Sequence, residues 1–304
     1  MDIIKDISII FISIFFESLP FLLLGALISS IIETYVSNET IAKIIPKNKI
    51  LGSIVGVVLG FFLPACDCAV IPVSKRLLKK KVPINVAVSF MLASPIINPV
   101  VLLSTYYAFY KTNPDIFWYR LAFGIGIALI VGIIMGIIFG KKPVIKNSIL
   151  EDDECEEECH CHEHHHKHTF KNDFLSIFKH TAYDLFEVVK YLMIGALIAS
   201  LVQVLIPRNI LTMFNSNSVL SIIALMLFAY LISLCSTSDS FVGKSLLTIF
   251  NKEAILAYLL LGPMIDIKNT IVLFGNYKKS FVISLISLIF IAVFIFSISV
   301  VISL

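Results

Sequence analysis

The feature that most constrains this chain is a series of apolar runs, each about 20 residues long, separated by short polar breaks. An α-helix rises about 1.5 Å per residue, so a run of that length crosses the ~30 Å hydrocarbon core of a bilayer. Of the 304 residues, 58% are hydrophobic and only 15% are charged, whereas soluble domains carry roughly 25% charged residues. We therefore expect an all-α integral membrane protein.

These runs predict about eight transmembrane helices, with Lys, Pro, Asn or Asp in the breaks between them. Within the second run, Gly52, Gly56 and Gly60 form a ridge of small residues, which is expected to pack closely against another helix. The expected spans are residues 14–36, 52–74, 84–108, 117–140, 183–206, 218–236, 253–275 and 280–303.

The chain also contains an internal repeat, a common property of transporter folds. The tetrapeptide Gly25-Ala26-Leu27-Ile28 returns 170 residues later as Gly195-Ala196-Leu197-Ile198. Other landmarks follow in the same order at nearly the same spacing. These landmarks are Cys66 with Cys235, Pro95 with Pro263, and Asn98 with Asp266.

The repeat divides the chain into three parts: residues 1–140 as a first four-span repeat, 141–172 as a loop, and 173–304 as a second four-span repeat. Four spans per half predict repeats of parallel orientation, whereas a re-entrant hairpin at Cys66–Pro83 would make them inverted. The sequence leaves both alternatives open. Lys and Arg in the short loops, above all in Lys75–Lys81, predict that both termini and the central loop are cytoplasmic in a plasma-membrane protein.

A first candidate site lies in the second span, where Pro64 and Pro72 bracket Cys66, Asp67 and Cys68. Each proline removes a backbone donor, so the helix is expected to break here. Asp67 is an ionisable group at membrane depth, and such groups usually face a cavity or a partner. Thiolates suit soft cations and trivalent metalloids. We predict that the two thiols and the carboxylate bind substrate; packing thiols with a capping carboxylate are the alternative.

A second pair of prolines, Pro95 and Pro99, brackets Asn98 in the third span, and Pro263 precedes Asp266 at the matching place in the seventh span. Helix breaks at matching places in two halves point to a transporter binding site, because unwound carbonyls and half-helix ends line it. Asn98 and Asp266 are therefore predicted to join the substrate site. Kinks that serve only helix packing are the alternative.

The second half keeps Cys235 where the first half has Cys66, and Asp239 follows four residues later. A site formed by both halves would then be asymmetric, with up to three thiols and two carboxylates. The alternative is that this segment begins a cytoplasmic loop. Glu17 and Glu187 lie at equivalent places just before their expected spans, and interfacial capping is favoured there over proton coupling.

The central loop combines eight acidic residues with a dense set of His and Cys side chains. Imidazole and thiolate are preferred ligands of zinc, copper and nickel. Because the spacing matches no folded zinc site, we expect loose binding of zinc or copper and require no cofactor; a solvated linker with incidental affinity is the alternative. The candidate metal ligands are Cys155, Cys159, His160, Cys161, His162, His164, His165, His166 and His168.

The segments Cys66–Pro72 and Ala93–Pro99 resemble a predicted-permease family that includes organoarsenical efflux permeases and copper and zinc efflux proteins. The resemblance covers nearly the whole chain and implies a plasma-membrane permease with thiols near the transport path, here Cys66 and Cys68. Many members have serine where this chain has Asp67, and this difference favours a cation over an arsenical.

The leading interpretation is a secondary-active efflux permease for a soft metal ion or a thiol-reactive metalloid, and no enzyme. A membrane metal sensor or scaffold without transport, and a membrane-embedded thiol redox protein, are the alternatives. The chain has no G-x-x-x-x-G-K-[ST] motif, so an ion gradient or a separate subunit must supply energy. Expected partners are the lipid bilayer and a small inorganic or organometal substrate, without nucleic acid; a homo-oligomer or a partner membrane subunit stays open, as does the coupling ion.

Overall fold

The computed structural model describes residues 2–35, 46, 48–62, 67–140, 142–146, 170–205 and 217–303. All the long elements in these ranges are helices, and one isolated bridge joins Ile145 to Tyr277. The helices are α1 (Asp2–Tyr35), α3 (Lys49–Phe62), α4 (Asp67–Lys79), α5 (Ile84–Ile97), α6 (Pro99–Phe109), α7 (Asp115–Phe139), α9 (Phe170–Leu205), α11 (Ser218–Ile232), α12 (Ser238–Leu246), α13 (Lys252–Met264), α14 (Ile267–Asn276) and α15 (Lys279–Ser303).

The expected class, an all-α membrane protein, is confirmed, but the expected number of spans is wrong. Among the described residues, six helical segments are long and apolar enough to cross a membrane. The helices α3 and α11 are apolar but have only 14 and 15 residues, fewer than the roughly 20 needed to span. The six segments are Ile3–Ile31, Ile84–Phe109, Asp115–Phe139, Val188–Leu205, Lys252–Asn276 and Lys279–Ile302.

The two short apolar helices belong to re-entrant hairpins. Along α3, Gly56 lies against Val86 of α5 and Gly60 lies against Ser94, so α3 runs parallel to α5. The chain must therefore return through α4 before α5 begins. In the second half α11 likewise runs beside α13 and α12 returns. The expected spans 52–74 and 218–236 are these hairpins, which enter and leave on one side.

The two halves have inverted orientations, the alternative that a re-entrant hairpin implied. Sequence alignment makes α7 equivalent to α15, and these helices lie antiparallel. The ring of Phe139, at the end of α7, is 5.5 Å from that of Phe281 near the start of α15. Phe123, nearer the start of α7, is 5.1 Å from Phe296 near the end of α15.

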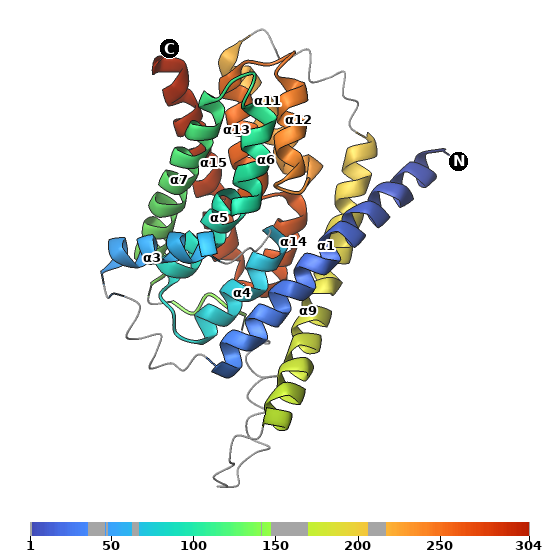
Figure 1. The fold of residues 1–304 in the computed structure, drawn as a ribbon, viewed down its shortest axis with the longest axis vertical. Coiled ribbons are helices and arrows are strands. Elements are labelled where there is room, and N and C mark those ends of the chain that lie inside the picture. The colour runs from blue at the N-terminus through green and yellow to red at the C-terminus, as the bar shows by residue number, and fades with distance from the viewer. Residues whose placement is uncertain are drawn as a thin grey trace.

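The ends of the helices bear on the expected placement of the termini. Figure 1 shows the start of α1 and the end of α15 toward the top, whereas α7 ends and α9 begins toward the bottom. Three spans separate these positions in each half. The start of α1 and the end of α15 therefore lie toward the opposite end of the molecule from the end of α7 and the start of α9, and the expected side of the membrane for the termini stays a prediction.

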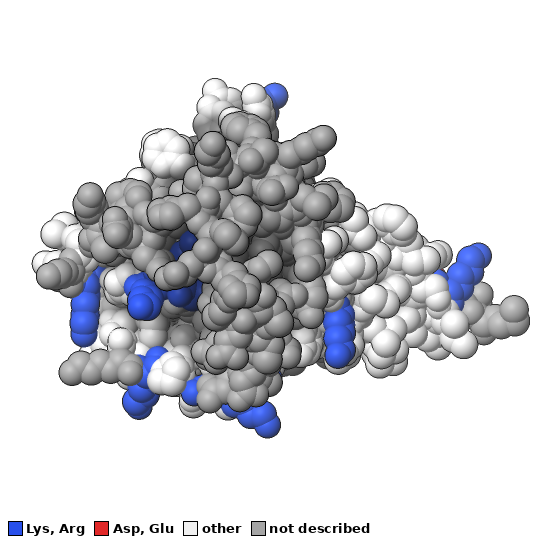
Figure 2. Space-filling view, turned by 90° about the horizontal axis from the view of Figure 1, so that it is seen from below, with Lys and Arg blue, Asp and Glu red and all other residues white. Residues whose placement is uncertain are grey.

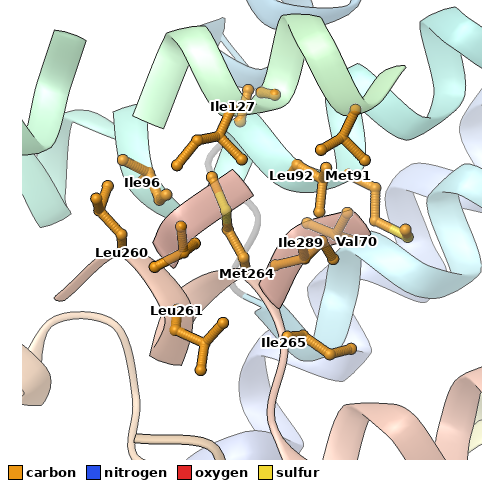
Figure 3. Close-up of a cluster of buried hydrophobic side chains, with 14 of the residues drawn as sticks. Val70, Met91, Leu92, Ile96, Ile127, Leu260, Leu261, Met264, Ile265 and Ile289 are labelled. Carbon is orange, nitrogen blue, oxygen red and sulfur yellow. The ribbon is translucent and has the colours of Figure 1, made fainter. Parts of the chain in front are cut away.

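The core joins the two halves through the interrupted spans. In the most apolar stretch of each span, 78% of the residues are buried in α5–α6 and 89% in α13–α14, whereas only 17% are buried in α1. Figure 3 shows this core, with Val70 of α4, Met91 of α5, Ile127 of α7, Met264 of α13 and Ile289 of α15 in one apolar cluster. The interrupted spans are thus held centrally, with α1 at the periphery.

The glycine ridge of α3 packs as expected. Gly52, Gly56 and Gly60 are all buried against α5. A Cβ at Gly56 would lie 2.4 Å from the carbonyl oxygen of Val86, closer than real Cβ atoms approach. Because these three glycines have no side chains, the first hairpin can contact the backbone of α5.

Candidate functional site

Two of the six spans are interrupted at the predicted places. Asn98 separates α5 from α6, and its Oδ1 accepts a hydrogen bond from the Val100 amide at 3.0 Å. Asp266 precedes α14, and its Oδ1 accepts one from the Asn269 amide at 2.6 Å. Each break thus begins a new helix with a side-chain cap, which satisfies one of the amides exposed there.

The prolines act differently from the sequence-based expectation. Pro99 is the first residue of α6, where its missing donor is harmless. Pro95 and Pro263 lie inside α5 and α13, shortly before the breaks. Pro72 lies inside α4 without interrupting it, so its expected role as a helix break is wrong. Because α4 begins at Asp67, Pro72 lies near its start and removes only one backbone hydrogen bond, which the helix tolerates. Pro64 lies outside the described residues.

Three buried charged side chains meet where α4 contacts α14. Lys268 Nζ lies 3.4 Å from Asp67 Oδ2 and 3.5 Å from Asp266 Oδ2. Asn269 Nδ2 donates to Asp67 Oδ2 at 3.1 Å. We call Asp67, Cys68, Asp266, Lys268 and Asn269 the lower crossing. It brings the tip of the first hairpin to the break in the second half.

A small pocket opens beside the lower crossing, between the first hairpin, α1 and the segment joining α11 to α12. Its free volume of about 10 Å³ has room for roughly one water molecule. A larger substrate therefore requires movement of the lining groups. The polar side chains that line it are Glu17, Ser18, Asp67, Cys68, Ser233, Cys235 and Lys268.

The two described thiols in this pocket form no disulfide. Cys68 Sγ lies 3.8 Å from Ser18 Oγ and 4.0 Å from Asp67 Oδ2, as weak donor contacts. Cys235 comes from the other half, and its Sγ lies 3.4 Å from Thr237 Oγ1. A soft ligand and a carboxylate therefore lie at the same end of α4. Cys66 falls outside the residues that the structure describes.

Glu17 is not at a membrane interface. It lies near the middle of the span Ile3–Ile31 and lines the pocket. The expectation that it caps an interface is therefore wrong, because the helix begins more than ten residues earlier than the expected span. The side chain of Glu187 is outside the described part.

A second polar cluster lies where α12 contacts α6 and α7. Arg120 is 1% exposed, and its Nη1 donates to Thr105 Oγ1 at 2.6 Å and Ser240 Oγ at 2.8 Å. Tyr258 donates its hydroxyl to Asp239 Oδ1 at 2.9 Å. We call Thr105, Arg120, Asp239, Ser240 and Tyr258 the upper crossing. Hydroxyl groups and one acid surround its arginine.

The structure thus gathers some of the predicted site residues and separates others. Asp67, Cys68 and Cys235 share one pocket, and Asp266 joins them through Lys268. Asp239 belongs to the upper crossing, where Tyr258 donates to it. Asn98 caps α6 and is absent from the described pocket lining.

Sequence reasoning missed the two basic residues that organise these clusters. Arg120 and Lys268 lie inside the expected spans 117–140 and 253–275 but were assigned to no site, and the structure leaves them only 1% and 3% exposed. The signal available was their position: Lys268 follows Asp266 by two residues within an otherwise apolar span, and Arg120 lies five residues inside α7. A basic residue inside a span favours a buried acidic partner over a loop.

Within the described ranges, no group of three or more His, Cys, Asp or Glu side chains is arranged to hold a metal ion. The ligands from Cys155 to His168, like Cys66, lie outside those ranges. Zinc or copper binding by the central loop stays a prediction.

Comparison with known proteins matches residues 3–303 to a family described as predicted permease. The chain is 39% identical over 288 residues to the UPF0718 protein YcgR of Bacillus subtilis, covering 95% of this chain and 94% of that one. It is 37% identical over 280 residues to a Streptococcus mutans protein named "Putative two-component membrane permease complex subunit", covering 91% and 89%. No solved structure is significantly similar. With matches over nearly its whole length, the chain belongs to the predicted-permease family.

Proposed function

We propose that this permease is a secondary-active exporter of a soft metal ion or thiol-reactive metalloid, and that the pocket beside the lower crossing is its substrate site. The observation that carries the proposal is the meeting of Cys68, Cys235 and Asp67 in one pocket between two re-entrant hairpins. Thiolates bind soft cations and metalloids, and interrupted helices supply ligands in transporters. A scaffold or sensor has no need of matched interruptions.

The distribution of basic residues supports an orientation with the central loop in the cytoplasm and both termini outside. Figure 2 shows the lower face, with Lys and Arg around its described part and no described Asp or Glu. Described Lys and Arg near the upper ends number five: Lys5, Lys111, Arg120, Lys244 and Lys252. Those near the lower ends number ten: Lys49, Lys75, Arg76, Lys79, Lys80, Lys81, Lys142, Lys146, Lys278 and Lys279. Excess positive charge marks the cytoplasmic side.

This orientation supports export. The first hairpin, which carries Asp67 and Cys68, would enter the membrane from the cytoplasm, on the same side as the His- and Cys-rich loop. The loop would then collect ions at the mouth of the path. Its ligands must be deprotonated to bind, so its affinity should fall as the pH drops through about 6.5, where free histidine titrates.

A partner subunit is also part of the proposal. The Streptococcus mutans relative carries the words "two-component" and "complex subunit" in its name. Because this chain has no nucleotide-binding motif, an ion gradient or such a partner must supply the energy for transport.

The test is accumulation of zinc, copper, cadmium and arsenicals by cells with and without the protein. We expect lower accumulation of at least one of them, and we expect Cys66→Ser combined with Cys68→Ser to abolish the difference at equal membrane expression. As a matched control, serine at Cys155, Cys159 and Cys161 should lower efficiency at low metal concentration and leave transport intact. Unchanged accumulation across the whole panel would contradict the proposed function.

A further inference from the structure

The strongest unexplained feature is Lys268, a lysine buried at an interrupted span. It is the second residue of α14, and its ammonium lies within 3.5 Å of carboxylates from both halves of the chain. We propose that Lys268 is a tethered cation that occupies the position of a cationic substrate, and that displacement of Lys268 makes the site select cations over neutral compounds. This inference rests on the proposed function of the pocket.

The charge balance at the lower crossing leaves negative charge for a second cation. Asp67 and Asp266 face one ammonium, and Glu17 lines the same pocket. Asn269 adds an unsatisfied acceptor, because its Oδ1 is buried and finds no donor among the described residues. Buried charges and acceptors are unfavourable when uncompensated. The site therefore holds more negative charge than the single ammonium of Lys268 neutralises.

The substrate and Lys268 would compete for the same oxygen. Cys68 Sγ and Lys268 Nζ both approach Asp67 Oδ2, at 4.0 and 3.4 Å. A metal ion held by Cys68 and Asp67 would therefore share this oxygen with the ammonium of Lys268. The free space beside the ammonium has room for roughly one water molecule, so a cation that enters it lies next to Lys268 and repels the ammonium from the carboxylates.

The backbone of Lys268 is fixed by packing, so displacement of the ammonium has to come from its side chain. A Cβ at Gly195 of α9 would lie 3.0 Å from the Lys268 carbonyl oxygen, so α9 packs directly on this backbone. The four-carbon stem of lysine is flexible, and its ammonium is a compact point charge. Displacement of the ammonium therefore takes rotation of the lysine stem, together with movement of the side chains that line the pocket, rather than a shift of α14.

Competition with an ammonium separates substrates by charge. A divalent cation that displaces Lys268 gains the interaction with Asp67 and Asp266. A neutral trivalent arsenical bonds to sulfur and gains nothing from those carboxylates. The site is therefore built for a cation, and its affinity for that cation is set by how strongly Lys268 is held.

The test uses the purified full-length protein and the rate at which Cys68 is alkylated, read by mass spectrometry of its peptide. The probes are Cd²⁺ and the neutral arsenical phenylarsine oxide, each titrated for the concentration that gives half protection. In Lys268→Gln, we expect half protection by Cd²⁺ at a concentration lower by at least about fivefold, a typical coupling between competing interactions. Half protection by phenylarsine oxide should not change. The control Lys279→Gln, an exposed lysine, should match the wild type.

Lys268→Arg tests the same idea if the glutamine variant does not fold. Arginine keeps the charge and can bind carboxylates with two parallel bonds, so half protection should require more Cd²⁺ and the same amount of arsenical. Unchanged or weaker protection by Cd²⁺ in Lys268→Gln, or tighter protection in Lys268→Arg, would overturn the inference while leaving the proposed function standing. Wild-type protein protected by neither probe would overturn both.

Discussion

The lower and upper crossings are built from helices that the sequence repeat makes equivalent, yet their charges differ. At the lower crossing, Asp67 and Asp266 share the single ammonium of Lys268, and thiols adjoin them. The upper crossing has one basic residue, Arg120, and one acidic residue, Asp239, and hydroxyl groups form hydrogen bonds with both. The two inverted halves therefore form two clusters of different charge. The upper crossing has equal numbers of acidic and basic side chains and holds a hairpin in place, whereas the lower crossing has an excess of acidic side chains, which the proposed function uses to bind a cation.

The largest expected effect is a difference between the two crossings in their contribution to the free energy of unfolding. Arg120→Met should lower the free energy of unfolding by about 3–5 kcal/mol, because it leaves the buried acid Asp239 in a cluster without a cation and the hydroxyls of Thr105 and Ser240 without their donor. Asp67→Asn should cost less, because Lys268 and Asp266 remain as a balanced pair. Thermal unfolding of both variants in detergent measures the difference. Equal losses would show that the two clusters do not differ in charge balance.

Gly25 and Gly262 allow the packing of the two crossings to be compared. A Cβ at Gly25 would lie 2.6 Å from Ala69 Cβ, so Gly25→Ala must push α1 away from α4. We expect a loss of about 1–3 kcal/mol in the free energy of unfolding, typical of overpacking. Gly262→Ala would instead meet the side-chain oxygen of Asp239 at 2.8 Å, which can rotate. A larger loss for Gly262→Ala would contradict this reading of the contacts, and chemical denaturation of both variants measures it.

The smallest effect concerns the thiols. Cys68→Ser removes the sulfur next to Asp67 and should weaken cadmium binding by at least about 10-fold, because loss of even an outer partner of a metal ligand costs that much. Cys235→Ser should cause a smaller loss, because its sulfur lies near Thr237 instead of the lower crossing. Cadmium titration of export in cells compares them. An equal or greater loss for Cys235→Ser would place the substrate nearer the second hairpin.

The sequence predicted features that depend on local chemistry. Apolar length identified the membrane class, and the Asn98 and Asp266 breaks follow from the prolines and capping groups beside them. The ridge of Gly52, Gly56 and Gly60 predicted close packing that the structure confirms. These features involve residues a few positions apart, where spacing alone carries the information.

Features that depend on distant contacts could not be read from spacing. Hydropathy does not distinguish a span from a re-entrant hairpin, because both bury apolar side chains, so α3 and α11 were counted as spans. The ion pair of Asp67 with Lys268 joins residues from opposite halves. Only the inverted arrangement of the halves brings α4 beside α14, and the sequence left parallel and inverted repeats equally open.

The central claim is that substrate binds at the lower crossing and that the upper crossing only supports the fold. Cadmium flux into proteoliposomes tests this most directly, with wild type, Asp67→Asn and Asp239→Asn reconstituted at equal amounts. The account predicts saturable flux in the wild type, its loss in Asp67→Asn, and a flux in Asp239→Asn that stays within about twofold of the wild type at equal folded protein. Retained flux in Asp67→Asn together with its loss in Asp239→Asn would contradict the account.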